Sequence, residues 1–398
     1  MDDLLIDLVN VNRPSIIQIF GVGGGGDNAV AHMYTEGNIA EVNYLVCNTD
    51  AKALETSPVP DRLQLGTDGL GAGGKPEKAR ELAEESIDRI RAAFDKRAKM
   101  LFITAGMGGG TGTGAAPVIA REAKAAGLLT IGVVTIPFLF EGYRKIDKAL
   151  DGVAELSKYV DAILVINNER LREIYQEFSI LDAFRKADDT LSVAVKSIVD
   201  IITMRGKMIL DFRDVHTTLH EGGVAIMSTG YAEGEGRVSR AIANALNSPL
   251  INDRDIFKSR KILLSISFSS SNELMVYEMN EIDRFMENFE DKYIETKYGL
   301  SVDESLGAKI KITILASGFG LHDFKQRESV MTFTEEDINR IIRRQDVYGS
   351  SSRTRTQRPT RTFLFGPDEL DDPEIIDAID STPTFRRTKE LIEKLRRR

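Results

Sequence analysis

The first half of the chain alternates short, almost continuous apolar runs with longer amphipathic segments. The apolar runs are Ile16–Phe20, Tyr44–Asn48, Met100–Ala105, Leu129–Ile136 and Ala162–Asn167. Runs of this length without polar alternation are typical of parallel strands buried on both faces. Intervening segments such as Lys75–Lys96 and Gly114–Ala126 predict helices. The pattern therefore predicts an α/β domain with a parallel, doubly wound sheet.

A long helix and a change of pattern follow this domain. From Ile180 to Ile202, apolar residues recur at spacings of three and four, which predicts one long helix with a buried face. Beyond it, strands of a second, smaller mixed α/β domain are expected at Val224–Met227, Lys261–Phe268, Leu274–Tyr277 and Lys309–Leu315. Because Lys309–Ile314 alternates polar and apolar residues, one face of this second sheet is expected to meet solvent.

The pattern suggests six segments along the chain. They are an N-terminal extension (1–14), a first domain (15–178), a central helix (179–204), a second domain (205–322), a variable linker (323–380) and a C-terminal peptide (381–398). The stretch Tyr348–Thr362 lacks apolar periodicity, so we expect it to be a disordered part of the linker.

Composition excludes several protein classes. The chain has 398 residues with 42% hydrophobic and 28% charged residues, which is ordinary for a globular protein of two domains. No apolar run reaches the ~18 residues of a membrane span. A net charge of −9 is not typical of a nucleic-acid binder. Cys47 is the single cysteine, which excludes an internal disulfide and fits a cytoplasmic protein.

Two glycine-rich loops each follow a predicted strand. One spans Gly21–Ala29 and the other Gly106–Gly114, where Thr111 and Thr113 add hydroxyl groups. Glycine lets the backbone approach a ligand closely, and a helix that starts after such a loop directs its N–H groups at an anion. Two such loops in one domain indicate a site for a polyphosphate chain.

Other phosphate-binding motifs fit less well. Gly21, Gly23 and Gly26 also satisfy the dinucleotide fingerprint, with Asp50 at the end of the next predicted strand, so a dinucleotide-dependent enzyme is an alternative. A dinucleotide fold does not need the second loop, however. A near match to a P-loop at Gly69 is excluded because Pro76 replaces the metal-binding hydroxyl residue.

The second loop also carries a family signature. The sequence GMGGGTGTG at 106–114 is accompanied by GVGGGG (21–26), NTDA (48–51), GLGAGG (69–74), FEG (140–142) and LDAF (181–184). With these motifs the chain resembles the tubulin superfamily and, within it, the FtsZ family of bacterial cell division, over about residues 15–320. The resemblance implies a GTP-binding and GTP-hydrolysing protein that polymerises head to tail in the cytoplasm, into filaments of the mid-cell division ring.

The resemblance also implies a set of nucleotide-binding residues. Phosphate and nearby contacts are expected from Gly23, Gly24, Gly25, Asp27, Asn28, Asn48, Asp50, Gly71, Ala72, Gly73, Gly74, Gly108, Gly109, Gly110, Thr111, Gly112 and Thr113. Ribose and base contacts are expected from Thr135, Glu141, Lys145, Asn168, Phe184, Asp188 and Asp189. Among these, Asn168 and Asp189 would recognise guanine and Phe184 would stack on the base.

The chain departs from the family pattern at several positions. Lys145 stands in place of the usual Arg, and Asp188 in place of an Asn. The hydrolytic carboxylates would be Asp211 and Asp214, supplied to the neighbouring subunit's nucleotide, but Ile209 replaces the usual Asn beside them. Because an isoleucine cannot orient water, a filament protein with little turnover is a further alternative.

Metal and partner expectations follow the same resemblance. His216 and His220 are four residues apart but lack a third ligand at a recognisable spacing, so no metal held by the protein alone is expected. Mg²⁺ is expected with the triphosphate. The segment Thr382–Arg387 loosely resembles the peptide that binds membrane-tethering division proteins of the FtsA type, and Leu391, Ile392 and Leu395 follow at helical spacing.

Overall fold

The computed structural model describes most of the chain. Described are residues 15–319 except 38, 40, 176, 205, 248–255 and 290–293, together with Arg340, Arg343, Arg344, Val347 and Tyr348. The chain divides into two units, Met1–Gly349 and Ser350–Arg398, and every described residue belongs to the first. The predicted N-terminal extension, most of the predicted linker and the C-terminal peptide lie outside the described residues.

All five strands predicted in the first half are present. They are β1 (Ile17–Val22), β2 (Val42–Asn48), β4 (Met100–Gly106), β5 (Leu129–Ile136) and β6 (Ala162–Asn167), and a short further strand that was not predicted is β3 (Arg62–Gln64). The helices between and after them are α1 (Gly23–Glu36), α2 (Ala51–Glu55), α3 (Pro76–Glu84), α4 (Ile87–Ala92), α5 (Thr111–Ala125), α6 (Tyr143–Leu156) and α7 (Asn168–Ile174). The single helix predicted over Lys75–Lys96 is broken in two at Ser86, whose hydroxyl bonds Leu82 O and accepts from Gly66 N.

The strand order places the two glycine loops side by side. β1 to β6 pair in parallel in the order β3-β2-β1-β4-β5-β6, so β1 lies between β2 and β4. Val22 at the end of β1 is in register with Ala105 near the end of β4. The chain continues from β1 to β2 on one side of β1 and later returns to β4 on its other side. Doubly wound folds bind ligands at such a switch point in the strand order.

The second half continues the same sheet. It contains α8 (Ile180–Thr203), β7 (Gly206–Met208), α9 (Phe212–Leu219), β8 (Gly223–Glu233), α10 (Arg237–Leu246), β9 (Lys261–Phe268), α11 (Met279–Met286), β10 (Glu295–Val302) and β11 (Lys309–Phe319). A short parallel pairing of β6 with β8 joins the two halves, and the sheet formed by the described residues has 11 strands. The second half follows the order β8-β11-β9-β10-β7 and is mixed.

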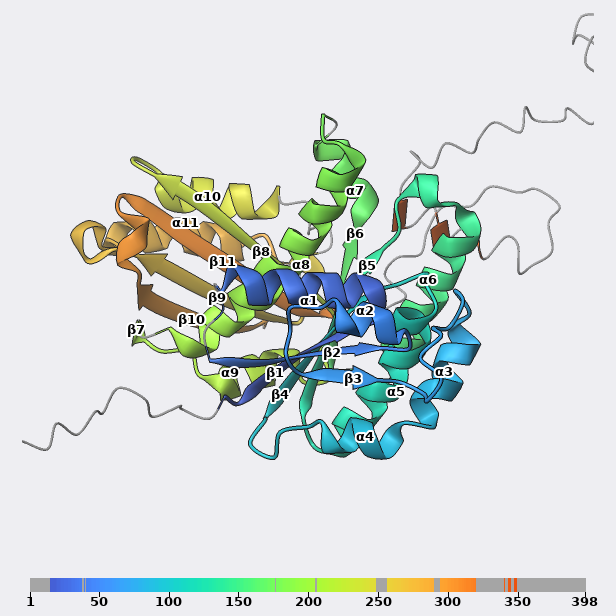
Figure 1. The fold of residues 1–398 in the computed structure, drawn as a ribbon. Coiled ribbons are helices and arrows are strands. Elements are labelled where there is room, and N and C mark those ends of the chain that lie inside the picture. Colours follow the sequence, from blue (N-terminus) through green and yellow to red (C-terminus); the bar gives the residue numbers. More distant parts are fainter. Residues whose placement is uncertain are drawn as a thin grey trace, which may run out of the picture. The chain divides into compact units, whose positions relative to one another are not determined.

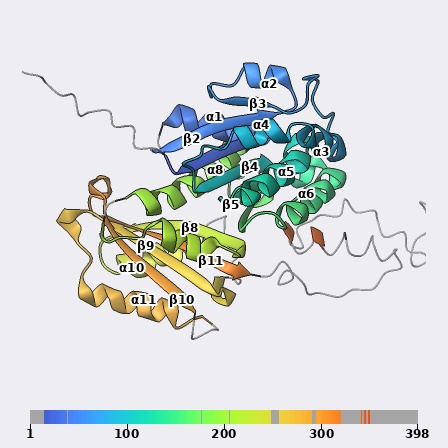
Figure 2. The same cartoon turned by 90° about the horizontal axis from the view of Figure 1, so that it is seen from below.

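The long central helix is confirmed and packs between the two halves. Figure 2 shows α8 between the N-terminal strands and the C-terminal strands, with α10 and α11 on the outer face of the latter. The layers of helices on either side of the N-terminal strands are visible in Figure 1. No described helix is long and apolar enough to cross a bilayer.

Two predictions for the second half are wrong. The C-terminal strands have no solvent-facing side at β11, because Lys311 and Thr313 are buried: Lys311 Nζ lies 3.1 Å from Asp200 Oδ2 on α8. The apolar run Leu274–Tyr277 is not a strand but a loop that enters a short 3₁₀ turn, Val276–Glu278. Met275, Val276 and Tyr277 face solvent, with Val276 89% exposed, whereas Leu274 is partly buried against the core.

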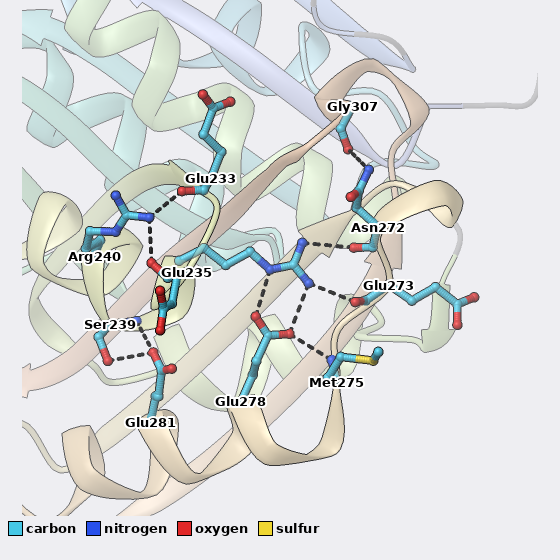
Figure 3. Close-up of polar contacts among 11 residues, drawn as sticks. Glu233, Glu235, Ser239, Arg240, Asn272, Glu273, Met275, Glu278, Glu281 and Gly307 are labelled. Atoms are coloured by element: carbon cyan, nitrogen blue, oxygen red, sulfur yellow. Dashed lines mark hydrogen bonds and ion pairs between the residues drawn. The ribbon is translucent and has the colours of Figure 1, made fainter.

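A buried arginine holds that exposed loop. Arg237 on α10 donates to both carboxylate oxygens of Glu278, at 2.8 and 3.0 Å, and to the backbone carbonyls of Asn272 and Glu273. Glu278 also accepts from Met275 N, and its pKa is lowered by the hydrogen bonds from Arg237. Figure 3 shows how these contacts converge. The loop is therefore an exposed apolar surface on a rigid support.

Candidate functional site

The two glycine loops touch where their helices begin. Gly23 has φ +72°, and a Cβ there would lie 2.7 Å from Gly112 N, so only glycine fits this contact. α1 begins at Gly23 and α5 at Thr111, and neither helix has a side-chain cap or an acidic residue in its first turn. Their first N–H groups and the positive ends of two helix dipoles are thus available to one anion.

A cavity of about 320 Å³ opens beside these loops. It is lined by Gly24, Gly25, Asn28, Gly106, Met107, Gly109, Gly110, Thr111, Gly112, Thr135, Pro137, Glu141, Lys145, Asn168, Phe184, Ala187 and Asp188. Thirteen of these were predicted from the sequence; Gly106, Met107, Pro137 and Ala187 were not. A signal existed for Ala187, which lies one helical turn after Phe184 and so shares its face.

One end of the cavity is suited to a flat ring with polar edges. Phe184 is held edge-on to Phe138 and Phe140, with ring centroids 5.2 and 6.5 Å away. Asn168 is buried, and its Oδ1 has no hydrogen-bond partner within the described part of the chain. A buried acceptor without a partner is costly, so a ligand that donates to it would be favoured.

The two neighbouring aspartates on α8 point to different surroundings. Asp188 lines the cavity, where burial and the charge of Asp189 raise its pKa to about 7. Asp189 does not line the cavity and instead pairs with His32 on α1, at 3.1 Å. The expected base-reading role of Asp189 therefore fits Asp188 better.

A further part of the wall is the loop between β5 and α6, which also carries Phe138 and Phe140. Thr135 is the last residue but one of β5, and Pro137 directly follows the strand. The Glu141 carboxylate accepts hydrogen bonds from Phe138 N at 2.9 Å and from Lys145 Nζ. These contacts stabilise the conformation of the loop. Gly108, with φ +97°, packs against Lys145 O and Pro137, and a Cβ there would clash with both.

Several predicted site residues hold the loops in place through hydrogen bonds. Of these, Asp27, Asn48, Asp50 and Thr113 do not line the cavity, whereas Thr111 does. Asp27 is buried and accepts from Asn48 Nδ2 at 2.6 Å; burial raises its pKa well above the usual range. Asp50 caps α2 by accepting from Lys52 N at 2.9 Å. Thr113 Oγ1 accepts from Gly108 N, and Thr111 Oγ1 bonds Thr49 Oγ1, both at 2.8 Å.

The loop Gly71–Gly74 lies against the second glycine loop. A Cβ on Gly110 would lie 3.0 Å from Ala72 Cβ and 3.3 Å from Gly74 Cα, so this loop adjoins the second glycine loop without lining the cavity. The predicted phosphate residues therefore gather in one place, although Gly23, Gly71, Ala72, Gly73, Gly74 and Gly108 are not cavity-lining.

The predicted hydrolytic pair lies elsewhere and has a structural role of its own. Asp211 Oδ1 accepts from Arg213 N and Asp214 N, and Asp214 Oδ2 accepts from Asp211 N, which forms a reciprocal cap at the start of α9. Asp214 also lies 3.4 Å from Lys297 Nζ. Ile209 beside them is 66% exposed. Neither aspartate lines the cavity of its own chain.

The histidine pair has ordinary partners. The rings of His216 and His220 stack at 4.9 Å, and His220 Nδ1 lies 3.0 Å from Asp161 Oδ1. Within the described residues no group of three or more His, Cys, Asp or Glu side chains is arranged to hold a metal ion.

Comparisons with known proteins show which family the chain belongs to. Residues 16–176 match the Tubulin/FtsZ family GTPase domain, 223–320 the FtsZ family C-terminal domain, and 357–398 a further FtsZ C-terminal pattern. The chain is 45% identical to the cell division protein FtsZ of Porphyromonas gingivalis, covering 99% of this chain and 91% of that protein. The first half therefore matches the part of the family that contains the GTPase domain.

Solved structures support the same assignment. An empty FtsZ dimer of M. jannaschii is similar with a TM-score of 0.70 and 34% identity, over 80% of this chain and 94% of that one. A GTPγS-bound CetZ2 protofilament from Haloferax volcanii shares the fold, with a TM-score of 0.68 at 19% identity over 84% and 99% of the two chains. The chain belongs to the tubulin/FtsZ family of GTPases, and within it to the FtsZ proteins of cell division.

Proposed function

We propose that GTP lies in the cavity between the two glycine loops and is hydrolysed when a second copy of the chain, stacked head to tail, supplies Asp211 and Asp214. The observation that carries this proposal is the separation of the two parts. The cavity holds binding groups, whereas the carboxylate pair stands beyond the opposite end of α8.

The length of α8 makes the separation large. Its 24 residues span about 36 Å at 1.5 Å per residue. Phe184 is near its first turn, and Asp211 follows eight residues after its last residue. A single chain cannot bring both ends to one phosphate without dismantling this helix, but a neighbouring copy can. Repeating such a contact gives an open filament.

At the phosphate end, the first N–H groups of α1 and α5 would bind the triphosphate, with Thr111 adding a hydroxyl. Each charge-assisted hydrogen bond contributes about 1.5–3 kcal/mol. Mg²⁺ would neutralise the β- and γ-phosphates and, in the absence of a protein cluster for it among the described residues, would be held mainly by phosphate oxygens and water.

At the base end, the acceptors favour guanine over adenine. Guanine presents N1–H and N2–H donors, which suit Asn168 Oδ1 and the Asp188 carboxylate, while adenine presents an acceptor at N1. Phe184 would stack on the base. Thr135, Glu141 and Lys145 also line the cavity and would face the ribose.

The dinucleotide-enzyme alternative has less support. Its ribose-binding carboxylate would be Asp50, but Asp50 is occupied as the cap of α2 and does not line the cavity. Competition experiments separate the two functions: GTP should displace a fluorescent guanine nucleotide, whereas ATP and nicotinamide dinucleotides should not.

Two variants that are each inactive test hydrolysis between subunits. Gly24→Glu adds a carboxylate to the phosphate end at a position where a Cβ meets no atom within 4 Å, so the fold should persist while GTP binding is lost. Asp211→Asn with Asp214→Asn keeps hydrogen-bonding oxygens for the α9 cap but removes both charges. Mixing the two variants should restore phosphate release, because the bound GTP of one meets the aspartates of the other. Absence of activity in the mixture, with both variants folded, would exclude this arrangement.

The remaining expectations concern place and partners. We infer that the protein acts in the cytoplasm at the mid-cell division site, as its family implies, and that the C-terminal peptide 381–398 binds a membrane-tethering protein of the FtsA type. The match of 357–398 to an FtsZ C-terminal pattern supports the second inference. The peptide itself lies outside the described residues.

A further inference from the structure

A segment that follows the second half of the sheet returns to the wall of the nucleotide site. Arg340, Arg343, Arg344, Val347 and Tyr348, here called the docking segment, are all helical and spaced so that they share one helix face. They lie within the predicted variable linker (323–380). Tyr348 begins the stretch Tyr348–Thr362, for which the sequence predicts disorder, so the expectation of disorder is wrong at Tyr348. Figure 1 shows the short red-brown pieces of this segment beside α6.

Tyr348 is an integral part of the core. It is 2% exposed and packs in the same cluster as Ile136 and Ile146. Its hydroxyl donates to Pro137 O at 2.5 Å, and burial, together with the charges of Glu169 and Glu141, raises its pKa well above the usual range. The backbone carbonyl of Val347 accepts from Asn167 Nδ2 at 2.8 Å.

Two arginines fix the segment along α6. Arg344 makes a bidentate pair with Asp147, both contacts 2.7 Å, and lies over the Tyr143 ring at 4.8 Å. Arg343 donates to Asp151 Oδ1 and to Leu150 O, both at 2.8 Å. A bidentate arginine–carboxylate pair fixes orientation as well as contact.

Two of these attachment points, Pro137 and Asn167, adjoin the nucleotide site directly, and the others lie along α6. Pro137 lines the cavity, and Asn167 precedes Asn168, which also lines it. α6 begins directly after the loop that bears Glu141 and carries Lys145 in its first turn. The docking segment therefore contacts three parts of the ribose and base wall without reaching the cavity, since none of its residues lines it.

We propose that the docking segment is a positioning element of the nucleotide site: Tyr348 and the Arg344–Asp147 pair hold the 137–145 wall in its binding geometry, and thereby slow the release of guanine nucleotide. The proposal rests on the function proposed above, in which this cavity holds GTP. A wall that is free to move would lose contacts to ribose and base while leaving the phosphate loops unchanged.

The experiment measures dissociation of a fluorescent GDP from the full-length protein, kept below the concentration at which it assembles. Tyr348→Ala should speed release by about tenfold, the loss expected for one buried hydrogen bond and its packing. Tyr348→Phe, which keeps the ring, should give a smaller increase. Arg344→Asp should also speed release, and adding Asp147→Arg should restore the slow rate.

Two controls separate positioning from general stability. Phe289→Ala removes a fully buried ring from the second half, far along the sheet from the 137–145 wall, and Arg121→Ala breaks another bidentate pair, with Glu84. Both should lower the melting temperature without changing release. Equal release rates for the wild type and Tyr348→Ala, or a Phe289→Ala effect as large as that of Tyr348→Ala, would overturn the proposal.

A readout without nucleotide keeps the two proposals distinguishable. Hydrogen exchange of the 137–145 amides should be faster in Tyr348→Ala than in the wild type, with the 106–114 amides unchanged. If the wild type bound no guanine nucleotide, the proposed function would be wrong. The exchange measurement would still test whether the docking segment holds the 137–145 wall, because it needs no nucleotide. Unchanged exchange at 137–145 would contradict it directly.

Discussion

Asp188 is the side chain whose chemistry most directly reports on the base end of the cavity. Its raised pKa, about 7, means that the carboxyl is close to half protonated in neutral solution when the cavity is empty. Guanine can donate hydrogen bonds only to an acceptor, so binding would favour the ionised form. Nucleotide binding and deprotonation of Asp188 are then linked.

This linkage predicts a pH dependence. GTP affinity should be nearly constant above pH 7.5 and should fall as the pH drops, approaching tenfold per unit below the pKa of about 7. Asp188→Asn keeps an acceptor but does not titrate, so its affinity should vary little between pH 6 and 8 when followed by fluorescence titration. Parallel profiles for the two proteins would show that another group is responsible.

The raised pKa of Asp188 also affects the stability of the nucleotide-free protein, which changes with pH in the opposite direction to the GTP affinity. Because the folded-state pKa of Asp188 is raised above 3.8, the folded protein without nucleotide loses stability as the pH rises from about 4 through 7. Asp188→Asn should therefore raise the melting temperature of the nucleotide-free protein at pH 8 and have little effect at pH 4.5.

Ile209 offers a test at the hydrolytic end. It is exposed and lies two residues before Asp211, where an amide could hold the attacking water on the neighbouring subunit's nucleotide. Ile209→Asn should raise the rate of phosphate release at saturating GTP, by up to about tenfold if water positioning is limiting. Met208→Asn, at an exposed neighbouring position, is the matched control and should not increase the rate. An equal or lower rate in Ile209→Asn would mean that other groups orient the water.

Among the structural elements, the loop held by Arg237 has the properties of an interface. Met275, Val276 and Tyr277 are exposed, yet the backbone around them is fixed by a buried ion pair, so little ordering is needed to bind another surface. The loop follows β9, and β7 with its exposed Met208 pairs with the end of β10 next to β9. The two exposed apolar sites thus lie at the same end of the C-terminal strands.

This arrangement predicts a separation of assembly from binding. Val276→Asp should reduce GTP-dependent sedimentation strongly while leaving the affinity for GTP unchanged, because the loop is remote from the cavity-lining residues. Val193→Asp provides the comparison, since Val193 is an exposed residue midway along α8 and away from both ends. Normal sedimentation of Val276→Asp would remove this loop from the filament contact.

The elements differ in how readily the sequence predicts them, and the reason is physical. The strands β1, β4 and β5 are buried on both faces, so their apolar runs are unambiguous. The run Leu274–Tyr277 is similarly apolar but lies mainly at the surface. Composition alone cannot distinguish such a surface loop from a buried strand. From the sequence, Lys311 is expected to face solvent. Its partner Asp200 lies 111 positions away, so the sequence does not show that the two side chains pair.

The candidate site shows the same limit. Some positions on the glycine loops, such as Gly23 and Gly108, are predictable because their backbone conformation and close packing restrict them to glycine. The choice between Asp188 and Asp189 depends on the rotation of α8 and on His32 from another helix, neither of which is local. The residues of the docking segment have the spacing of one helix face, which is visible in the sequence. The acidic residues that they contact on α6 are nearly 200 positions away, so local pattern does not predict the contact.

Over the chain as a whole, the residues proposed for nucleotide binding, hydrolysis and attachment lie in separate segments of the sequence. The cavity lies at the carboxyl ends of β1 and β4, the Asp211–Asp214 pair follows α8, and the predicted partner-binding peptide is at the C-terminus. This separation predicts that attachment can be removed without loss of assembly.

Deleting Ser381–Arg398 is the test of that separation. The peptide has Phe385 and, at helical spacing, Leu391, Ile392 and Leu395 among basic residues, a pattern that suits a segment folding into a partner's apolar groove. The truncated protein should sediment with GTP and release phosphate like the full chain, because every cavity-lining residue and the Asp211–Asp214 pair lie within residues 15–319, outside the deleted segment. It should no longer be recruited to vesicles that carry an FtsA-type tethering protein, and Phe385→Ala in the full chain should reproduce part of that loss. Failure of the truncated protein to assemble would instead place the peptide in the filament contact itself.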